Sequence, residues 1–144
     1  MLKKILWIED EYYALQGLLL PLEQLGFEIV MAATALEGFH KAQSWQEYDM
    51  IVLDLILPFT DVMETIPVEI ESWKDENYIG VPLAKWLKQR IRVQCPVLLL
   101  SVVGDPIEQF KLDQVGLFEY LPKRGLLPSV VKGKILDMLK CGIN

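Results

Sequence analysis

The sequence predicts an α/β fold in which five short parallel strands form a doubly wound sheet with helices on both faces. Short apolar runs alternate along the chain with segments of helical periodicity. Parallel strands need crossover connections, and helices that make these connections cover both faces of the sheet. Polar residues also follow several of the apolar runs, as expected where parallel strands end at one rim.

The first elements are a strand, a helix and a second strand. The apolar run at residues 2–8 has no helical period and predicts a buried strand. Residues 12–25 carry leucines at spacings of three and four, which predicts a helix that ends at Gly26. Pro21 removes one backbone hydrogen bond within this helix. Residues 27–32 predict the second strand.

The next helix has a recognisable start, and the later elements follow the same alternation. Thr34 and Glu37 form a Ser/Thr-x-x-Glu capping box, which predicts a helix that runs to about Ser44. Residues 50–55 predict a third strand that is apolar except for Asp54. The remaining elements are expected at 81–92 (helix), 97–101 (strand), 106–115 (helix), 119–121 (strand) and 128–139 (helix).

Size and composition indicate one soluble domain that covers residues 1–144. The chain is 52% hydrophobic and 24% charged, which is typical of a compact protein with its own core. Its apolar stretches are shorter than the roughly 20 residues of a membrane-spanning helix. Acidic residues also follow the first apolar run too early for a secretory signal, so we expect a cytoplasmic protein without membrane contact.

Charge and cysteine content exclude several functional classes. The formal net charge of -6 argues against nucleic acid as a partner, because phosphates require a basic surface. Cys95 and Cys141 are far apart and lack a CxxC or histidine-rich context, which argues against a disulfide framework and a zinc site.

Polar residues at the strand ends are the candidate site. Carboxylates that meet at one rim repel each other unless a cation lies between them, and oxygen ligands favour Mg²⁺ over zinc. An aspartate beside a cation can attack a phosphoryl group, while a hydroxyl and an ammonium stabilise the transferred group. The residues expected at this rim are Glu9, Asp10, Glu11, Asp54, Ser101 and Lys123.

Each of these residues also has an ordinary structural interpretation. Glu9 and Asp10 could simply stabilise the following helix, because acidic side chains interact favourably with the positive N-terminal end of a helix dipole. Ser101 and Lys123, taken singly, could be structural, and Tyr120 could be a core aromatic residue. Asp54 is the strongest candidate because a carboxylate within an apolar strand is costly unless it is paired or liganded.

Four segments resemble the response-regulator receiver family, and together they span essentially the whole chain. This resemblance implies a flavodoxin-like receiver fold with phosphorylation on an aspartate. The segments are Ile5–Glu11 (ILWIEDE), Ile51–Pro58 (IVLDLILP), Pro96–Ser101 (PVLLLS) and Tyr120–Lys123 (YLPK).

The resemblance implies a role for each matching residue. Asp54 would be the phosphoacceptor. Asp10 and the backbone carbonyl of Ile56 would bind Mg²⁺ directly together with Asp54, and Glu9 would reach the ion through water.

Three further residues would respond to the phosphoryl group. Ser101 and Lys123 would contact it, and Tyr120 would be the switch aromatic that turns inward when Ser101 moves. The phosphoryl donor would be a sensor histidine kinase or a phosphotransfer protein. We expect no appended output domain after the last helix, so the signal would pass to a separate downstream protein or through a homodimer. Such a receiver catalyses only its own phosphorylation and dephosphorylation.

The segment at about 59–79 departs from the family pattern. It separates the third strand from Gly80, where receivers usually have a short loop. Alternating apolar residues at 66–70 predict a short edge strand, with Pro67 consistent with an edge. We hypothesise that this insertion borders the phosphorylation site and tunes partner choice, the alternative being a tolerated surface insertion. Aromatic residues expected to hold it to the domain are Phe59, Trp73 and Tyr78.

A second departure lies at Lys123 and Arg124, where the family has Lys-Pro with a cis bond. A cis bond before Arg124 would cost about 3–4 kcal/mol, so we expect this loop to take another path.

Two other functions compete with the phosphorylation switch. An aspartate-nucleophile phosphatase would need an Asp-x-Asp motif, and Asp54 is followed by Leu55 and Ile56 without a second acid. A receiver-like interaction module that works without phosphorylation is suggested by the insertion and by Arg124.

Overall fold

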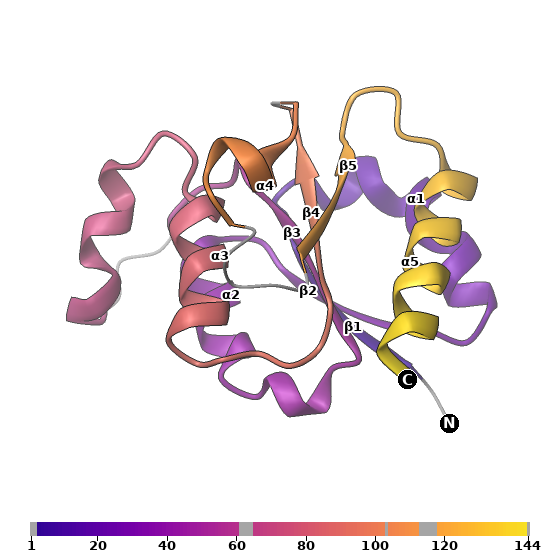
Figure 1. The fold of residues 1–144 in the computed structure, drawn as a ribbon, viewed down its shortest axis with the longest axis horizontal. Helices are drawn as coiled ribbons and strands as arrows, with labels where there is room; N and C mark the ends of the chain where they lie inside the picture. Colours follow the sequence, from indigo (N-terminus) through magenta and orange to yellow (C-terminus); the bar gives the residue numbers. More distant parts are fainter. Residues whose placement is uncertain (1–2, 61–64, 103, 113–117, 144) are drawn as a thin grey trace.

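The computed structural model describes residues 3–60, 65–102, 104–112 and 118–143. A central sheet lies between two helical layers (Figure 1). Among the described residues, no helix combines the length and the apolar character needed to cross a lipid bilayer. The elements are β1 (Lys4–Ile8), α1 (Tyr12–Gln24), β2 (Glu28–Ala32), α2 (Ala35–Ala42), η1 (Trp45–Glu47), β3 (Met50–Asp54), η2 (Val68–Asp75), α3 (Gly80–Gln89), β4 (Val97–Ser101), α4 (Pro106–Gln109), β5 (Phe118–Pro122) and α5 (Pro128–Ile143).

The sheet confirms the predicted fold class. Its five strands are parallel and lie in the order β2-β1-β3-β4-β5. The chain moves outward from β1 to β2 and then continues on the other side of β1 with β3, so the strand order reverses between β1 and β3. In open parallel sheets this reversal opens a crevice beyond the carboxyl ends of the strands. The candidate residues after β1 and β3 therefore lie beside this crevice.

Apolar strands form two cores, one on each face of the sheet. Alternate residues of β1 point to opposite faces, so Ile5 and Trp7 join the core under α1 and α5 while Leu6 and Ile8 join the core under α2 and α3. Figure 1 shows these two helix pairs on opposite sides of the strands. The predicted end of α1 is also confirmed, because Gly26 has a φ of 93°, a conformation that favours glycine.

The start of α2 is held by the loop that follows β3. Thr34 is the N-cap, and its hydroxyl accepts a hydrogen bond from the amide of Glu37 at 3.1 Å, as the capping box predicts. The carbonyls of Pro58 and Phe59 accept hydrogen bonds of 2.9 Å from the first two amides of α2. These four amide and carbonyl groups tie the segment after Asp54 to the second helix.

The predicted edge strand at residues 66–70 is wrong, because Val68–Asp75 forms the 3-10 helix η2. The alternating pattern was misleading because every third or fourth residue is also apolar: Ile70 and Trp73 are buried. The rings of Trp73 and Phe39 lie 6.1 Å apart, and those of Trp73 and Trp86 lie 6.2 Å apart. Figure 1 shows η2 on the outer side of α2 and α3. Phe59 and Tyr78 also pack against this core, as predicted for the aromatic residues of the segment.

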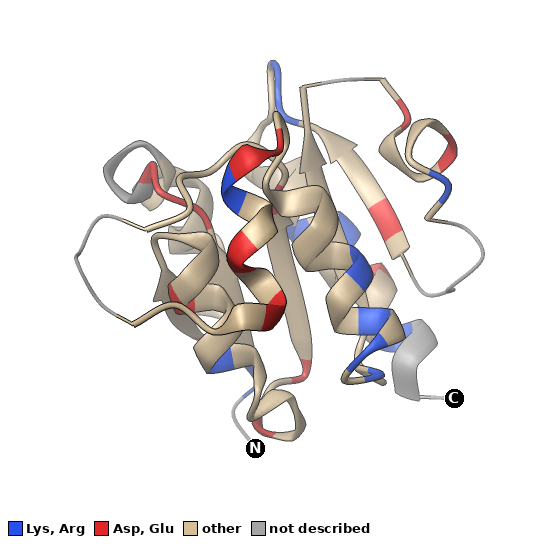
Figure 2. Ribbon diagram, turned by 90° about the vertical axis from the view of Figure 1, so that its left-hand side faces the viewer, with Lys and Arg blue, Asp and Glu red and all other residues tan. Residues whose placement is uncertain are grey.

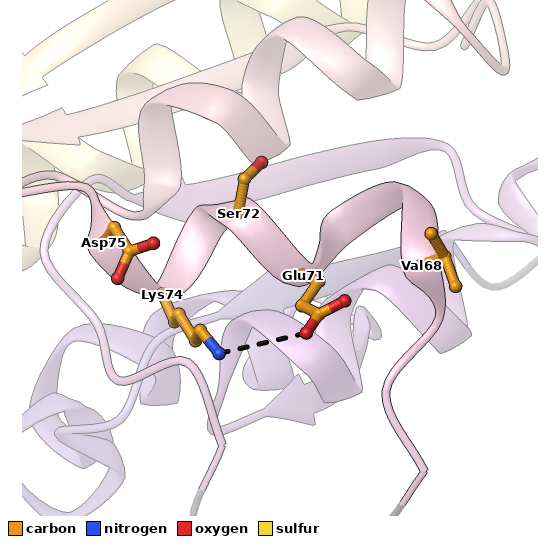
Figure 3. Close-up of a pocket in the computed structure, with 5 residues that line it drawn as sticks. All are labelled: Val68, Glu71, Ser72, Lys74 and Asp75. Atoms are coloured by element: carbon orange, nitrogen blue, oxygen red, sulfur yellow. Dashed lines mark ion pairs between the residues drawn. The ribbon is translucent and has the colours of Figure 1, made fainter.

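The outer surface of η2 is acidic and faces away from the sheet (Figure 2). Lys74 forms a 4.0 Å ion pair with Glu71 on this surface, and both side chains are more than half exposed. A hollow beside this pair is lined by Val68, Glu71, Ser72, Lys74 and Asp75 (Figure 3). Within the described part of the insertion, η2 therefore packs against the α2/α3 layer.

Two helices are shorter than predicted. The expected helix at 81–92 is α3, which ends at Gln89, and Arg92 has a φ of 54°. The expected helix at 106–115 is α4, which ends at Gln109; Lys111 has a φ of 56° and cannot continue it. Residues 113–115 of that prediction lie outside the described residues.

Candidate functional site

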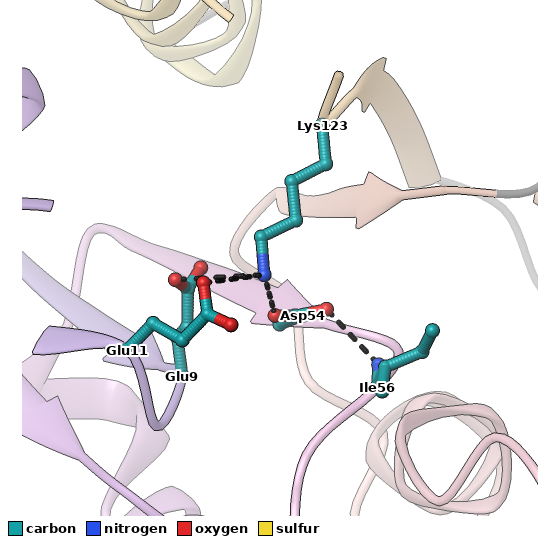
Figure 4. A network of polar contacts seen from close by, with 5 residues as sticks. All are labelled: Glu9, Glu11, Asp54, Ile56 and Lys123. Atoms are coloured by element: carbon teal, nitrogen blue, oxygen red, sulfur yellow. Dashed lines mark hydrogen bonds and ion pairs between the residues drawn. The ribbon is translucent and has the colours of Figure 1, made fainter. Parts of the chain in front are cut away.

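Asp54 ends β3 and is almost fully buried at the rim of the sheet, with 1% of its surface exposed. Both carboxylate oxygens have partners (Figure 4). Oδ1 accepts a hydrogen bond of 3.0 Å from the amide of Ile56, and Oδ2 lies 2.5 Å from the Nζ of Lys123. Asp54 is therefore held by one neutral donor and one cation.

Lys123 places its ammonium among three carboxylates. It directly follows β5, and its backbone amide donates a 2.8 Å hydrogen bond to the carbonyl of Ser101 at the end of β4. From there its side chain crosses to β3 and β1 (Figure 4). Its Nζ lies 3.7 Å from Glu9 and 3.7 Å from Glu11, in addition to its contact with Asp54. The structure thus brings Lys123 to the position expected for it, although the next residue is Arg124.

Glu9 and Asp10 follow β1 but differ in environment. Glu9 is fully buried, and neither of its carboxylate oxygens has a hydrogen-bond partner among the described residues. Asp10 is exposed, yet its charge is close enough to Asp54 to raise the pKa of that residue. Glu9, Asp10 and Asp54 therefore lie near one another, as predicted. The side chain of Glu9 is buried, whereas that of Asp10 is exposed.

Burial and like charges shift the pKa values of the site. Burial raises the pKa of Glu9 from 4.5 to about 7, and nearby Asp54 and Glu11 add to the effect while Lys123 opposes it. Burial also raises the pKa of Asp54, against the hydrogen bonds from Lys123 and Ile56. Burial by itself lowers the pKa of Lys123, but the hydrogen bond to Asp54 and the surrounding carboxylates raise it overall. Three carboxylates thus share the single ammonium of Lys123 in these contacts.

Ser101 and Tyr120 lie where the sequence places them, at different depths. Ser101 ends β4 and is 3% exposed, and β4 is the strand next to β3. Tyr120 lies on β5, is half-buried and packs against the core under α2 and α3. Ser101 thus shares the rim with Asp54, whereas Tyr120 lies deeper along its strand.

Gly80 was missed as a part of the site, and Glu11 was expected at the rim but without a partner of its own. Glu11 is a third consecutive acid after β1, and only the folded chain shows that it pairs with Lys123. A Cβ on Gly80 would lie 2.5 Å from the carbonyl oxygen of Asp54 and 2.5 Å from the Cα of Leu55. The amide of Gly80 donates a 3.0 Å hydrogen bond to the carbonyl of Leu55, so α3 begins directly against the end of β3.

The residue types of the site suit Mg²⁺. Carboxylate oxygens are its preferred protein ligands, and the buried oxygens of Glu9 lack the partners that such groups normally have. Within the described ranges, no three acidic, histidine or cysteine side chains are grouped closely enough to hold a metal ion. The ammonium of Lys123 instead occupies the space among the acids. The donor chemistry therefore fits the ion, while in the present arrangement Lys123 is the cation that lies between the acids.

Without divalent cations, the free energy of unfolding is expected to fall as the pH rises from about 4.5 to about 7. The folded chain holds the Glu9 proton up to about pH 7, whereas the unfolded chain releases it near 4.5. Stability decreases with pH wherever the folded state binds more protons, here by about 3 kcal/mol. Urea unfolding in EDTA at pH 5 and pH 8 measures this change. Glu9→Gln should reduce the dependence of the free energy of unfolding on pH. If this free energy changed equally with pH in both proteins, the raised pKa of Glu9 would not be its cause.

Sequence comparisons connect the chain to response regulators. No protein-family model matches it. It is 27% identical over 140 residues to the alkaline phosphatase synthesis transcriptional regulatory protein PhoP of Bacillus subtilis, covering 97% of this chain and 50% of PhoP. It is 28% identical over 120 residues to the transcriptional regulatory protein CusR of Escherichia coli, covering 83% of this chain and 44% of CusR. The chain thus spans about half of the length of these relatives.

Solved structures give the same result for the fold. A CheY-like response regulator receiver domain protein from Methanospirillum hungatei superposes with a TM-score of 0.71 at 22% identity, covering 99% of this chain and 97% of that one. The chemotaxis response regulator CheY4 of Vibrio cholerae superposes with a TM-score of 0.69 at 21% identity, covering 96% and 99%. The chain therefore has the fold of response-regulator receiver domains, and its sequence relatives are response regulators.

Proposed function

We propose that the chain is a phosphorylation switch that accepts one phosphoryl group on Asp54 in a Mg²⁺-dependent reaction. One observation carries this proposal: a buried aspartate ends the central strand β3, with an ammonium at one oxygen and a backbone amide at the other. A carboxylate at a sheet rim, beside a cationic side chain and further acids, is suited to nucleophilic attack on phosphorus.

The chemistry assigns each group a distinct part. A carboxylate oxygen of Asp54 forms a bond to phosphorus, and the bond from phosphorus to the donor's leaving group breaks with its electron pair. Oδ2 is paired with Lys123 and Oδ1 with the Ile56 amide, and the attacking oxygen would use a lone pair that these contacts leave free. Lys123 then faces the phosphoryl oxygens, and the hydroxyl of Ser101 donates to one of them.

Mg²⁺ would be held by the acids of the rim. Asp10, Asp54 and the carbonyl of Ile56 would bind it directly, and Glu9 through water, as the receiver resemblance implies. When bound, the ion shields the negative charge of the transferred group. Because Lys123 lies among these acids, the ion and the ammonium would have to share the pocket.

The partners follow from this reaction. A sensor histidine kinase or a phosphotransfer protein would supply the phosphoryl group in the cytoplasm. The added charge would draw Ser101 toward the phosphoryl group, keep Lys123 beside it and let Tyr120 turn inward, which changes the surface near α4, β5 and α5. A downstream protein or a second copy of the chain would bind that changed surface. The chain itself would catalyse only its own phosphorylation and dephosphorylation.

Incubation with Mg²⁺ and acetyl phosphate, read by intact mass spectrometry, tests the proposal. We expect one added phosphoryl group in the wild-type chain and none in Asp54→Asn. Asp49→Asn is the matched control: Asp49 lies just before β3, accepts a 2.8 Å hydrogen bond from the amide of Lys4 and is remote from the site, so it should leave phosphorylation intact. EDTA should prevent the reaction.

Two outcomes would favour the competing functions. Continued breakdown of acetyl phosphate without a stable adduct, lost in Asp54→Asn, would indicate a phosphatase. The absence of any adduct with both acetyl phosphate and a phosphorylated histidine donor would indicate an interaction module that works without phosphorylation.

A further inference from the structure

Two fully buried polar side chains beside the site have no hydrogen-bond partner among the described residues. They are the indole N–H of Trp7 and the carboxylate of Glu9, both with 0% of their surface exposed. An indole N–H acts only as a donor, and an ionised carboxylate acts only as an acceptor. Each residue is therefore the kind of partner that the other lacks.

The backbone places these two side chains on the same face of the sheet. β1 ends at Ile8, but the amide of Glu9 still donates a 2.9 Å hydrogen bond to the carbonyl of Ala32 in β2. Strand geometry thus continues through Glu9, and residues two apart on a strand point to the same side. Trp7 belongs to the core under α1 and α5, and Glu9 is the next residue on that side, at the rim.

The two groups already influence each other. The indole of Trp7 stabilises the charged form of Glu9 and so lowers its pKa, although burial and neighbouring acids outweigh this effect. Oε2 of Glu9 lies 3.7 Å from the Nζ of Lys123. A buried donor or acceptor without a partner costs about 1–3 kcal/mol, and one hydrogen bond between these residues would satisfy the indole N–H and one of the two carboxylate oxygens.

We propose that Trp7 is a positioning residue for Glu9: its indole N–H donates a hydrogen bond to the Glu9 carboxylate and holds it toward Asp54 and Lys123. A glutamate has one more rotatable bond than an aspartate, so a carboxylate at this depth needs a fixed donor to keep its direction. The rigid indole, packed in the core, supplies that donor. This inference rests on the proposed function, because it assigns Trp7 to the wall of the proposed Mg²⁺ pocket.

The first test is Mg²⁺ binding by Trp7→Phe, measured by isothermal titration calorimetry. This change keeps an aromatic ring in the core and removes the N–H donor. We expect Mg²⁺ affinity to fall about tenfold, the usual effect of removing a group that orients a metal ligand. Trp86→Phe is the matched control, because it removes an indole N–H that donates to Glu69 at 3.4 Å on the α2/α3 side. Equal affinities of wild type and Trp7→Phe would overturn the proposal.

The second test needs neither metal nor a folded Trp7→Phe protein. The chain has four tryptophans, whose indole N–H signals are resolved by proton–nitrogen NMR. A hydrogen bond to Glu9 should place the Trp7 signal downfield in wild type and upfield in Glu9→Met, which has no carboxylate. A Trp7 signal that is the same in both proteins contradicts the proposal. A wild-type chain that does not bind Mg²⁺ would contradict the proposed function, and the NMR comparison would still decide on Trp7.

Discussion

Replacing Lys123 by Met should lower the free energy of unfolding by about 3 kcal/mol at pH 8 in the absence of divalent cations. The ammonium contacts Asp54 and lies 3.7 Å from both Glu9 and Glu11, and two of these acids are almost completely buried. Without it, buried carboxylates face each other with no cation between them. Urea unfolding of the variant in EDTA measures the loss, and added Mg²⁺ should restore part of it.

Lys134→Met is the control for this substitution. Lys134 pairs with Glu119 between α5 and β5, and both side chains are partly exposed. Exposed ion pairs contribute about 0–1 kcal/mol, so this variant should remain close to wild type. The combination of Lys123→Met with Glu9→Gln should recover stability, because it removes one of the unpaired charges. If Lys123→Met were no less stable than Lys134→Met, the buried acids would not depend on Lys123 for their stability.

Gly80→Ala should lower the free energy of unfolding by about 3 kcal/mol, at the upper end of the usual cost of overpacking. The added Cβ would lie 2.5 Å from both the carbonyl oxygen of Asp54 and the Cα of Leu55. These are backbone atoms of the segment that carries the phosphoacceptor, so no side chain can turn away to make room. Thermal and urea unfolding measure the change, and a weaker amide signal for Ile56 in NMR would report the displaced end of β3.

Gly17→Ala is the control for Gly80→Ala, because the same substitution at Gly17 should not lower the free energy of unfolding. Gly17 lies within α1, and apart from the nearby helix backbone a Cβ there would have no atom of the described residues within 4 Å. Alanine is a better helix former than glycine by about 1 kcal/mol, so Gly17→Ala should be neutral or stabilising. A Gly80→Ala variant as stable as Gly17→Ala would show that α3 does not start tightly against β3.

Local patterns in the sequence were sufficient to predict the sheet. Short apolar runs with no helical period became the five strands, and their parallel order followed from the helices between them. Thr34 and Glu37 predicted the start of α2, and Gly26 predicted the end of α1. These features depend on neighbours within a few residues, so the sequence alone was enough to identify them.

The insertion shows where local patterns were ambiguous. Apolar residues at 66, 68 and 70 match a strand, whereas Ile70 and Trp73 match a helical face, and the short segment does not distinguish these alternatives. Packing of Trp73 against Phe39 and Trp86 decided in favour of η2. Those contacts join residues that are far apart in the sequence, and no local pattern contains them.

The sequence by itself determined the fold class and which polar residues follow the strands, because apolar periodicity and strand ends are local properties. Only the tertiary structure decided that Lys123 lies among Glu9, Glu11 and Asp54, that Glu9 is buried while Asp10 is exposed, and that Trp7 is buried on the same side of the sheet as Glu9. The physical reason is that burial and charge pairing depend on side chains from separate strands meeting at one rim.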